Sequence, residues 1–149
     1  MRATIIALLS AVMLLASVTA ATAGMSRIEY NSAKLVNVER RDAGLSTVKR
    51  QACLQRHADV HASRMAAKGK IYHRTSSALR TVMKRCQLTS IAENLASGTR
   101  MTSISAVDAW MGSTGHRRNL LNPSYNRIGA AYANGDNSQR YWIQLYGRH

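Results

Sequence analysis

Hydrophobic residues recur every three to four positions over much of the chain, which is the spacing of helices with one buried face. The clearest stripe predicts a helix over residues 48–68 with four apolar residues on one side: Leu54, Ala58, Ala62 and Met65. A weaker stripe predicts an earlier helix that runs to about Arg41 and ends at Gly44, burying Ile28, Leu35 and Val38. Ser26 and Glu29 have the spacing of a capping box that would begin this earlier helix.

Two further helices are predicted in the middle of the chain. One begins at Ser76–Ser77, and four residues share its inner face: Leu79, Val82, Met83 and Cys86. The other is capped by Thr102 or Ser103 and carries the apolar residues Ile104, Val107 and Met111. A short helical turn follows His116 and ends at Asn122–Pro123, because the residue before a proline disfavours helical backbone.

The pattern changes to that of strands at three places. Residues 90–98 (SIAENLASG) form a short apolar run that ends in glycine, and residues 127–133 and 140–147 flank the loop NGDNSQ as a β-hairpin. Helices that precede and separate the strands, with an antiparallel hairpin at the end, predict a sheet covered by helices rather than a repeated β-α-β unit.

The first 23 residues have the composition of a secretory signal peptide. Arg2 gives a positive start, residues 5–18 are almost wholly apolar, and residues 21–23 (Ala-Thr-Ala) suit a cleavage site. The apolar run is short for a membrane span, which disfavours a retained anchor. We therefore expect a secreted or periplasmic protein whose mature chain, residues 24–149, is one domain without a transmembrane segment.

The chain is strongly basic. It has 21 lysines and arginines against 7 acidic residues, a formal net charge of +14, and loss of Arg2 would leave +13. Such a surface attracts polyanions, which outside the cytoplasm would be anionic envelope components. The cations are scattered and no nucleic-acid-binding motif accompanies them, so we expect no specific nucleic-acid partner.

The sequence contains two cysteines, Cys53 and Cys86. In an oxidising compartment they are expected to form one intramolecular disulfide, whose loop of 33 residues would stabilise the fold by about 3–4 kcal/mol. The alternatives are two free buried thiols, or a catalytic thiol whose histidine partner is distant in sequence.

Three titratable residues lie at element boundaries or within otherwise apolar segments: His73, Glu93 and His116. A buried Glu93 would need a partner, and imidazoles are suitable partners. Two neutral imidazoles and a carboxylate can hold zinc with an open fourth position, and without metal they form an acid–base pair near neutral pH. Arg117 and Arg118 would disfavour protonation of His116 but would also repel a cation.

Other candidates are weaker. His57 and His61 have the spacing of the histidines in H-E-x-x-H, but Ala58 follows the first histidine where that motif has its glutamate. We expect both to be ordinary helix residues. The core is expected to contain the aromatic residues Trp110, Tyr141, Trp142 and Tyr146.

Five segments together, in this order, resemble the bacterial secreted branch of the CAP superfamily, which comprises cysteine-rich secretory, antigen 5 and pathogenesis-related 1 proteins. They are LVNVERRDAGL, HADVHASRMAAKGKIYHRT, AENLASG, AVDAWMGSTGHRRNLLNPSYNRIGAAYA and YWIQLYG, and they span about Leu35 to Gly147. The resemblance implies an α+β fold, a three-layer α-β-α sandwich with a mainly antiparallel central sheet and a shallow cleft.

In this family a His-Glu-Glu-His tetrad lines the cleft, and the two histidines of some members hold a divalent metal, often zinc. By matching motif, the resemblance assigns the first histidine to His73, one glutamate to Glu93 and the last histidine to His116. The other glutamate falls on Ser113, so this chain lacks that carboxylate and would have fewer groups to orient its metal ligands.

Three functions are compatible with these features, and they leave open whether the protein is an enzyme. The favoured one is a binding domain whose His/Glu cleft takes a small molecule, a lipid or a partner, with or without a divalent metal. The second is a hydrolase of peptides, esters or glycans, in which His73 and His116 hold the metal and Glu93 moves the proton. The third is a basic envelope or host-interaction protein without an active cleft.

Overall fold

The computed structural model describes residues 27–149, except for the side chains of Arg27, Ile28 and Asn137. The predicted signal peptide and Ser26 of the predicted capping box lie outside this range. The elements, in chain order, are α1 (Arg27–Asp42), β1 (Lys49–Arg50), α2 (Ala52–Ala67), α3 (Ser76–Arg85), β2 (Ser90–Thr99), α4 (Ser103–Met111), α5 (Thr114–Leu120), β3 (Arg127–Asn134), a 3₁₀ turn (Asp136–Ser138) and β4 (Gln139–Arg148).

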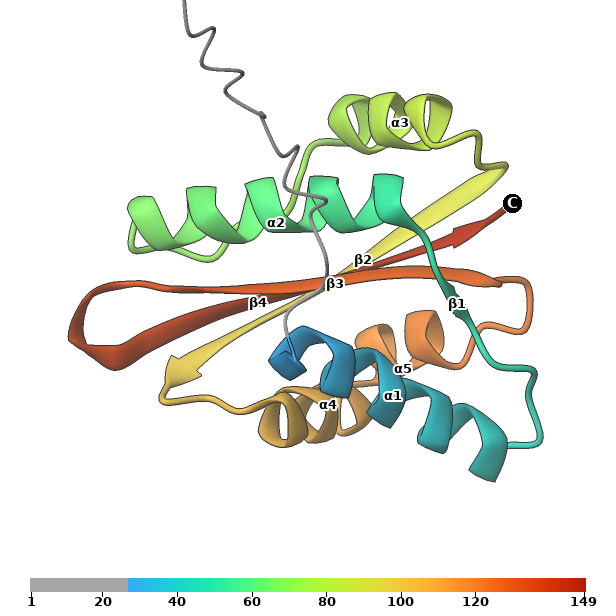
Figure 1. Cartoon of the computed structure of the whole chain (residues 1–149), viewed down its shortest axis with the longest axis horizontal. Helices are drawn as coiled ribbons and strands as arrows, with labels where there is room; N and C mark the ends of the chain where they lie inside the picture. The colour runs from blue at the N-terminus through green and yellow to red at the C-terminus, as the bar shows by residue number, and fades with distance from the viewer. Residues whose placement is uncertain (1–26) are drawn as a thin grey trace, which may run out of the picture.

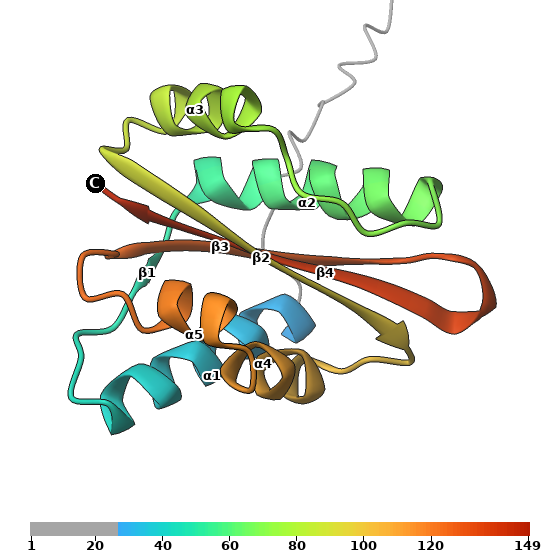
Figure 2. The same ribbon diagram turned by 180° about the vertical axis from the view of Figure 1, so that it is seen from behind.

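A four-stranded sheet in the order β1-β3-β4-β2 lies between two layers of helices (Figure 1). α2 and α3 cover one face and α1, α4 and α5 cover the other, as the opposite view also shows (Figure 2). β4 pairs antiparallel with β2 and β3, whereas β1 pairs parallel with β3. The predicted α-β-α sandwich with a mainly antiparallel sheet is therefore confirmed.

Each face of the sheet has its own hydrophobic core, because successive strand residues point to opposite faces. On one side, α2 buries the predicted stripe completely: Leu54, Ala58, Ala62 and Met65. On the other side, Trp110 of α4 packs with Trp142 and Tyr146 of β4. These aromatic residues are buried, as predicted, and so is Tyr141.

Gly129 of β3 brings α2 close to the sheet. A Cβ atom at this position would lie 2.4 Å from the main-chain carbon of Leu54. The missing side chain therefore lets the first turn of α2 pack directly on the β3 backbone.

The start of α2 differs from the prediction. The helix begins at Ala52, not near residue 48, because the preceding residues pair with β3. The amide of Lys49 donates to the carbonyl of Asn126, and that of Gln51 donates to the carbonyl of Ile128. A tertiary strand contact thus replaces the first turn of the predicted helix.

The predicted inner face of α1 is wrong. Leu35 is half-buried and Val38 is 38 % exposed, whereas Val36 and Arg40 are fully buried. The buried Arg40 guanidinium donates to four main-chain carbonyls, one after α1 and three at or after the end of α5: Ser46, Leu120, Asn122 and Tyr125. Ile104 of α4 is 60 % exposed and lines a groove with Leu35 and Val38.

Several local predictions are confirmed. Cys53 and Cys86 form a disulfide that links the start of α2 to the end of α3. Gly44 and Gly69 follow α1 and α2 with φ of 69° and 60°, the left-handed conformation that suits a glycine after a helix. Thr102 caps α4 through a capping box.

Candidate metal and ligand site at the edge of the sheet

β2 is an edge strand, and side chains of the neighbouring helices donate to its carbonyl groups. Trp110 Nε1 of α4 lies 2.9 Å from the carbonyl oxygen of Leu95. Asn119 Nδ2 of α5 lies 3.5 Å from that of Glu93. These contacts fix both helices against a strand whose edge would otherwise be open to pairing with another chain.

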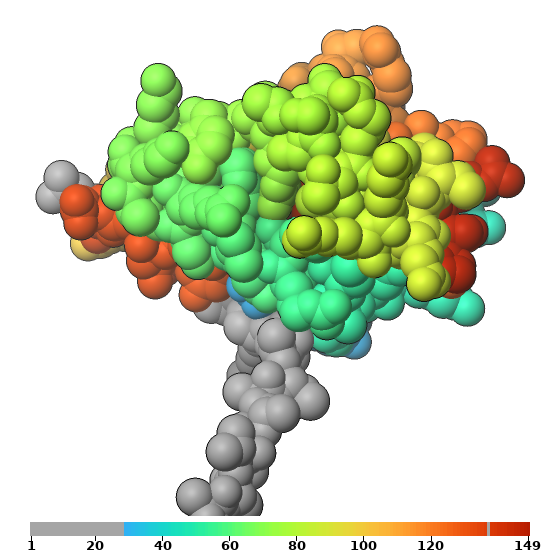
Figure 3. Space-filling model, turned by 90° about the horizontal axis from the view of Figure 1, so that it is seen from above, coloured from blue at the N-terminus to red at the C-terminus, as the bar shows by residue number. Residues whose placement is uncertain are grey.

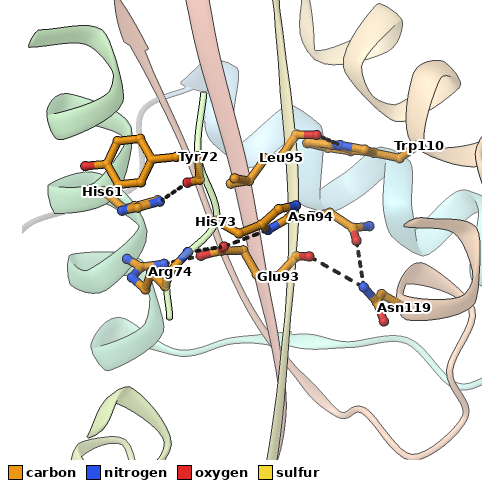
Figure 4. A network of polar contacts seen from close by, with 9 residues as sticks. All are labelled: His61, Tyr72, His73, Arg74, Glu93, Asn94, Leu95, Trp110 and Asn119. Carbon is orange, nitrogen blue, oxygen red and sulfur yellow. Dashed lines mark hydrogen bonds and ion pairs between the residues drawn. The ribbon is translucent and has the colours of Figure 1, made fainter. Parts of the chain in front are cut away.

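Glu93 lies in the middle of β2, on the face that α2 and α3 cover, and only 2 % of its side chain is exposed. His73 Nδ1 and the main-chain amide of Arg74 donate to its Oε1 over 3.0 and 3.1 Å. The Arg74 guanidinium donates to Oε2 over 2.5 Å. Figure 4 shows these contacts from close by. The structure therefore brings His73 and Glu93 into direct contact and satisfies the buried carboxylate.

His73 lies in the segment between α2 and α3, and 61 % of its side chain is exposed. An ionised carboxylate only accepts hydrogen bonds, so Nδ1 carries the proton that it donates to Glu93. In the neutral ring, Nε2 then keeps its lone pair. The contact with Glu93 fixes both the tautomer and the direction of the ring.

Arg74 is a member of this site that the sequence analysis missed. Its guanidinium donates to Glu93 and also to the main-chain carbonyl of His57 on α2, and 9 % of its side chain is exposed. Burial lowers the pKa of Arg74 from its usual value, while the Glu93 carboxylate acts in the opposite direction. Its position directly after His73 is a sequence signal, but this chain has many arginines and most of them are exposed.

His116 lies within α5, not before it as predicted. Its main-chain carbonyl accepts a hydrogen bond from Asn94 Nδ2 over 2.9 Å, and Asn119 Nδ2 donates to Asn94 Oδ1 over 2.9 Å. Alternation along β2 directs Glu93 to one face and Asn94 to the other, where α5 lies. This pair of amides, which the sequence analysis also missed, holds the His116 backbone beside the strand that carries Glu93.

The two imidazoles come from opposite layers of the sandwich, and His73 acts electrostatically on His116. Burial lowers the pKa of half-buried His116, and the charge of His73 lowers it further. The expected cause, the charges of Arg117 and Arg118, is not the one found. The neutral form of His116 is therefore favoured, which is the form that binds a metal ion.

Among residues 27–149, one group of three potential ligand residues has its donor atoms within 4.8 Å of one another: Cys53, His57 and Cys86. Its two sulfur atoms form the disulfide, so the group offers no thiolate to a metal. His73, Glu93 and His116 do not form such a compact group. Glu93 is therefore placed to orient His73 from behind, not to share a metal ion with both histidines.

His61 has a structural role, in agreement with the prediction for the pair on α2. It is buried, its Nε2 donates to the carbonyl of Tyr72 over 2.9 Å, and its ring contacts the Tyr72 ring edge-on (Figure 4). This contact anchors the segment immediately before His73. His57, one turn earlier, is half-buried.

Comparison with known proteins gives a consistent family assignment. Residues 33–146 match the family described as "CAP: Cysteine-rich secretory protein family". The chain belongs to the CAP family. This CAP domain is 31 % identical over 132 residues to the uncharacterized protein YkwD of Bacillus subtilis. The matched region covers 86 % of this chain and 50 % of that relative. The chain thus spans about half the length of that relative.

Solved structures share the fold. An outer surface protein from Borrelia burgdorferi superposes with a TM-score of 0.74 at 19 % identity, over 85 % of this chain and 96 % of that one. NaASP2, solved with Zn²⁺, gives a TM-score of 0.66 at 14 % identity, over 84 % and 82 %. In the described part of this CAP domain, every helix is too short or too polar to cross a bilayer.

Proposed function

We propose that this CAP protein acts outside the cytoplasm and binds a small ligand at the β2 edge through a divalent cation held by His73 and His116. The observation that carries the proposal is the pairing of His73 with Glu93. The carboxylate holds Nδ1 while 61 % of the His73 side chain stays exposed, so Nε2 is oriented and accessible. The disulfide and the secretory family support a location in an oxidising compartment.

The chemistry of the donors fits a cation of the zinc class. Imidazole nitrogens suit zinc, and a carboxylate behind a ligating histidine is the usual way to fix its tautomer and raise its basicity. The lowered pKa of His116 keeps the second imidazole unprotonated at neutral pH. NaASP2, a protein of the same fold, was solved with Zn²⁺. When bound, the cation would supply a Lewis acid with open positions for an oxygen or nitrogen atom of the ligand.

Zinc titration by calorimetry tests this proposal. The His73→Ala variant should lose most of its zinc affinity without unfolding, because the His73 ring is largely exposed, and the His116→Ala variant should lose affinity as well. Glu93→Gln should weaken binding by about 10–100-fold, as expected for a residue that orients a ligand. His149→Ala is the matched control, since the side chain of this exposed histidine forms no hydrogen bond or ion pair with the described chain.

Unchanged zinc binding in the His73→Ala variant would disprove the assignment of the site. The same protein samples separate binding from hydrolysis. The binding function predicts that zinc-loaded protein releases no product from peptide, ester or glycan substrates. Turnover that disappears in a folded Glu93→Gln variant would instead identify the metal-assisted hydrolase.

A further inference from the structure

A cavity of about 430 Å³ lies between α2 and α3, on the face viewed in Figure 3. In that view the surface of α2 is green and that of α3 is yellow-green. Three arginines line the cavity: Arg64, Arg74 and Arg85. Apolar side chains complete much of its wall: Val60, Ala78 and Val82.

The arginines of this cavity have almost no acidic counterpart. Within residues 27–149, both ion pairs end on Glu93, and only Arg74 among the three arginines takes part in one. The side chains of Arg64 and Arg85 form no hydrogen bond or ion pair with the described chain, and both residues are exposed. Like charges that converge without a counterion repel one another, and a bound anion would relieve that repulsion.

Arg74 forms part of the cavity wall and keeps donors available. A guanidinium carries five N–H groups. One of those in Arg74 donates to Glu93 and another to the carbonyl of His57, which leaves the others without a partner in the described chain. Because these two contacts fix the guanidinium, its remaining donors are oriented before any ligand arrives.

The charges of the arginines also act on His57 in the wall of the cavity. His57, which also lines it, has a pKa lowered first by its burial and then by Arg74, Arg85 and Arg56. Arg74 and Arg85, which both line the cavity, thus act on a third lining residue, and Arg64 in turn lowers the pKa of Arg74.

We propose that the cavity between α2 and α3 binds a phosphomonoester, with the phosphoryl oxygens on Arg64, Arg74 and Arg85 and the adjoining apolar group against Val60 and Val82. Guanidinium groups bind phosphate oxygens in a planar, two-point geometry, which suits arginine better than lysine. A phosphomonoester carries close to two negative charges at neutral pH and so matches several cations better than a carboxylate does. The cavity shares Arg74 with the proposed cation site, where this residue contacts Glu93, but the two proposals concern different ligands and neither one requires the other.

Calorimetric titration of the full chain with phenyl phosphate tests the proposal, with sodium chloride of equal ionic strength as the reference titration. The Arg64→Gln/Arg85→Gln variant should bind at least about tenfold more weakly, since a net charge-assisted hydrogen bond contributes enough for that factor. Both arginines lack partners in the described chain, so the variant should fold. Lys49→Gln/Arg50→Gln is the matched control: it removes the same charge from the exposed β1 and should bind within about twofold of the wild type.

Equal losses of phenyl phosphate affinity in the two double variants would overturn the proposal, and so would a titration with phenyl phosphate that does not saturate. A second arm identifies the source of the phosphoryl group. Sedimentation with phosphatidic acid vesicles, displaced by phenyl phosphate and lost in Arg64→Gln/Arg85→Gln, would support the site with a lipid headgroup as its ligand. Phenyl phosphate binding without sedimentation would support the site with a soluble phosphomonoester.

Discussion

The contact between Arg74 and Glu93 makes a quantitative prediction about stability. The side chains of both residues are buried, with 9 % and 2 % exposed, and their charged atoms are 2.5 Å apart. In the Arg74→Met variant the carboxylate would lose its cation but remain buried. It would keep two hydrogen bonds, from the main-chain amide at position 74 and from His73 Nδ1.

Two estimates agree on the size of the effect. Charge centres about 4 Å apart interact by about 4 kcal/mol at an effective dielectric constant near 20. Removing one partner of a buried ion pair typically costs about 3–5 kcal/mol, because an uncompensated charge remains. We therefore expect Arg74→Met to lower the free energy of unfolding by about 4 kcal/mol. Arg74→Met/Glu93→Gln should recover part of this loss, since no unpaired charge stays buried.

Urea unfolding at pH 7, followed by circular dichroism, gives the four free energies of the double-mutant cycle. Arg56→Met is the control, because this exposed arginine of α2 makes no ion pair with the described chain and should change stability by less than about 0.5 kcal/mol. A loss of stability below about 1 kcal/mol in Arg74→Met, or strictly additive effects in the cycle, would refute the conclusion that Arg74 stabilises the buried carboxylate of Glu93.

Three other predictions address the stability of the fold around the site. Gly129→Ala should lower the free energy of unfolding by about 1–3 kcal/mol, measured by thermal unfolding, because its Cβ would overlap the backbone of Leu54. An unchanged stability would contradict the packing of α2 on β3. The Cys53→Ser/Cys86→Ser variant should have a free energy of unfolding about 3–4 kcal/mol lower than the wild type, measured with urea. A reductant should not change the stability of this variant further. Burial lowers the pKa of His61 below its usual 6.5, so the unfolded chain takes up its proton at higher pH than the folded chain does. Stability should therefore fall as the pH decreases below 6.5, and His61→Gln should weaken this dependence; an unchanged pH profile would contradict it.

Features that depend on short-range periodicity could be predicted from the sequence. The stripe of α2, the strand at 90–98 and the hairpin of β3 and β4 need only local patterns, and the disulfide follows from two cysteines and an oxidising compartment. β1 could not be predicted, because its two residues become a strand only by pairing with β3. The buried face of α1 was predicted wrongly because Arg40 is a charged residue that enters the interior to bind loop carbonyls.

The titratable residues of the candidate site could be predicted from the sequence, but the supporting residues that hold them in place could not. A glutamate in an apolar strand requires a partner, and this requirement pointed to the histidines. The position of Arg74 directly after His73 is a weak signal among many exposed arginines, and nothing in the local pattern distinguishes Asn94 and Asn119 from the other amide residues. Their roles arise from packing: Arg74 spans from α2 to β2, and the two amides span from β2 to α5.

The open edge of β2 explains why these supports lie where they do. An edge strand leaves main-chain carbonyls to be satisfied, and Trp110 and Asn119 donate to two of them from the α4–α5 layer. On the opposite face, the α2–α3 layer supplies the partners of Glu93 from the same strand. Both helical layers are therefore held by hydrogen bonds to one strand at the edge of the sheet. A strand added beside β2 would compete for these carbonyl groups, so the position of β2 at the edge is what lets side chains of α4 and α5 donate to them.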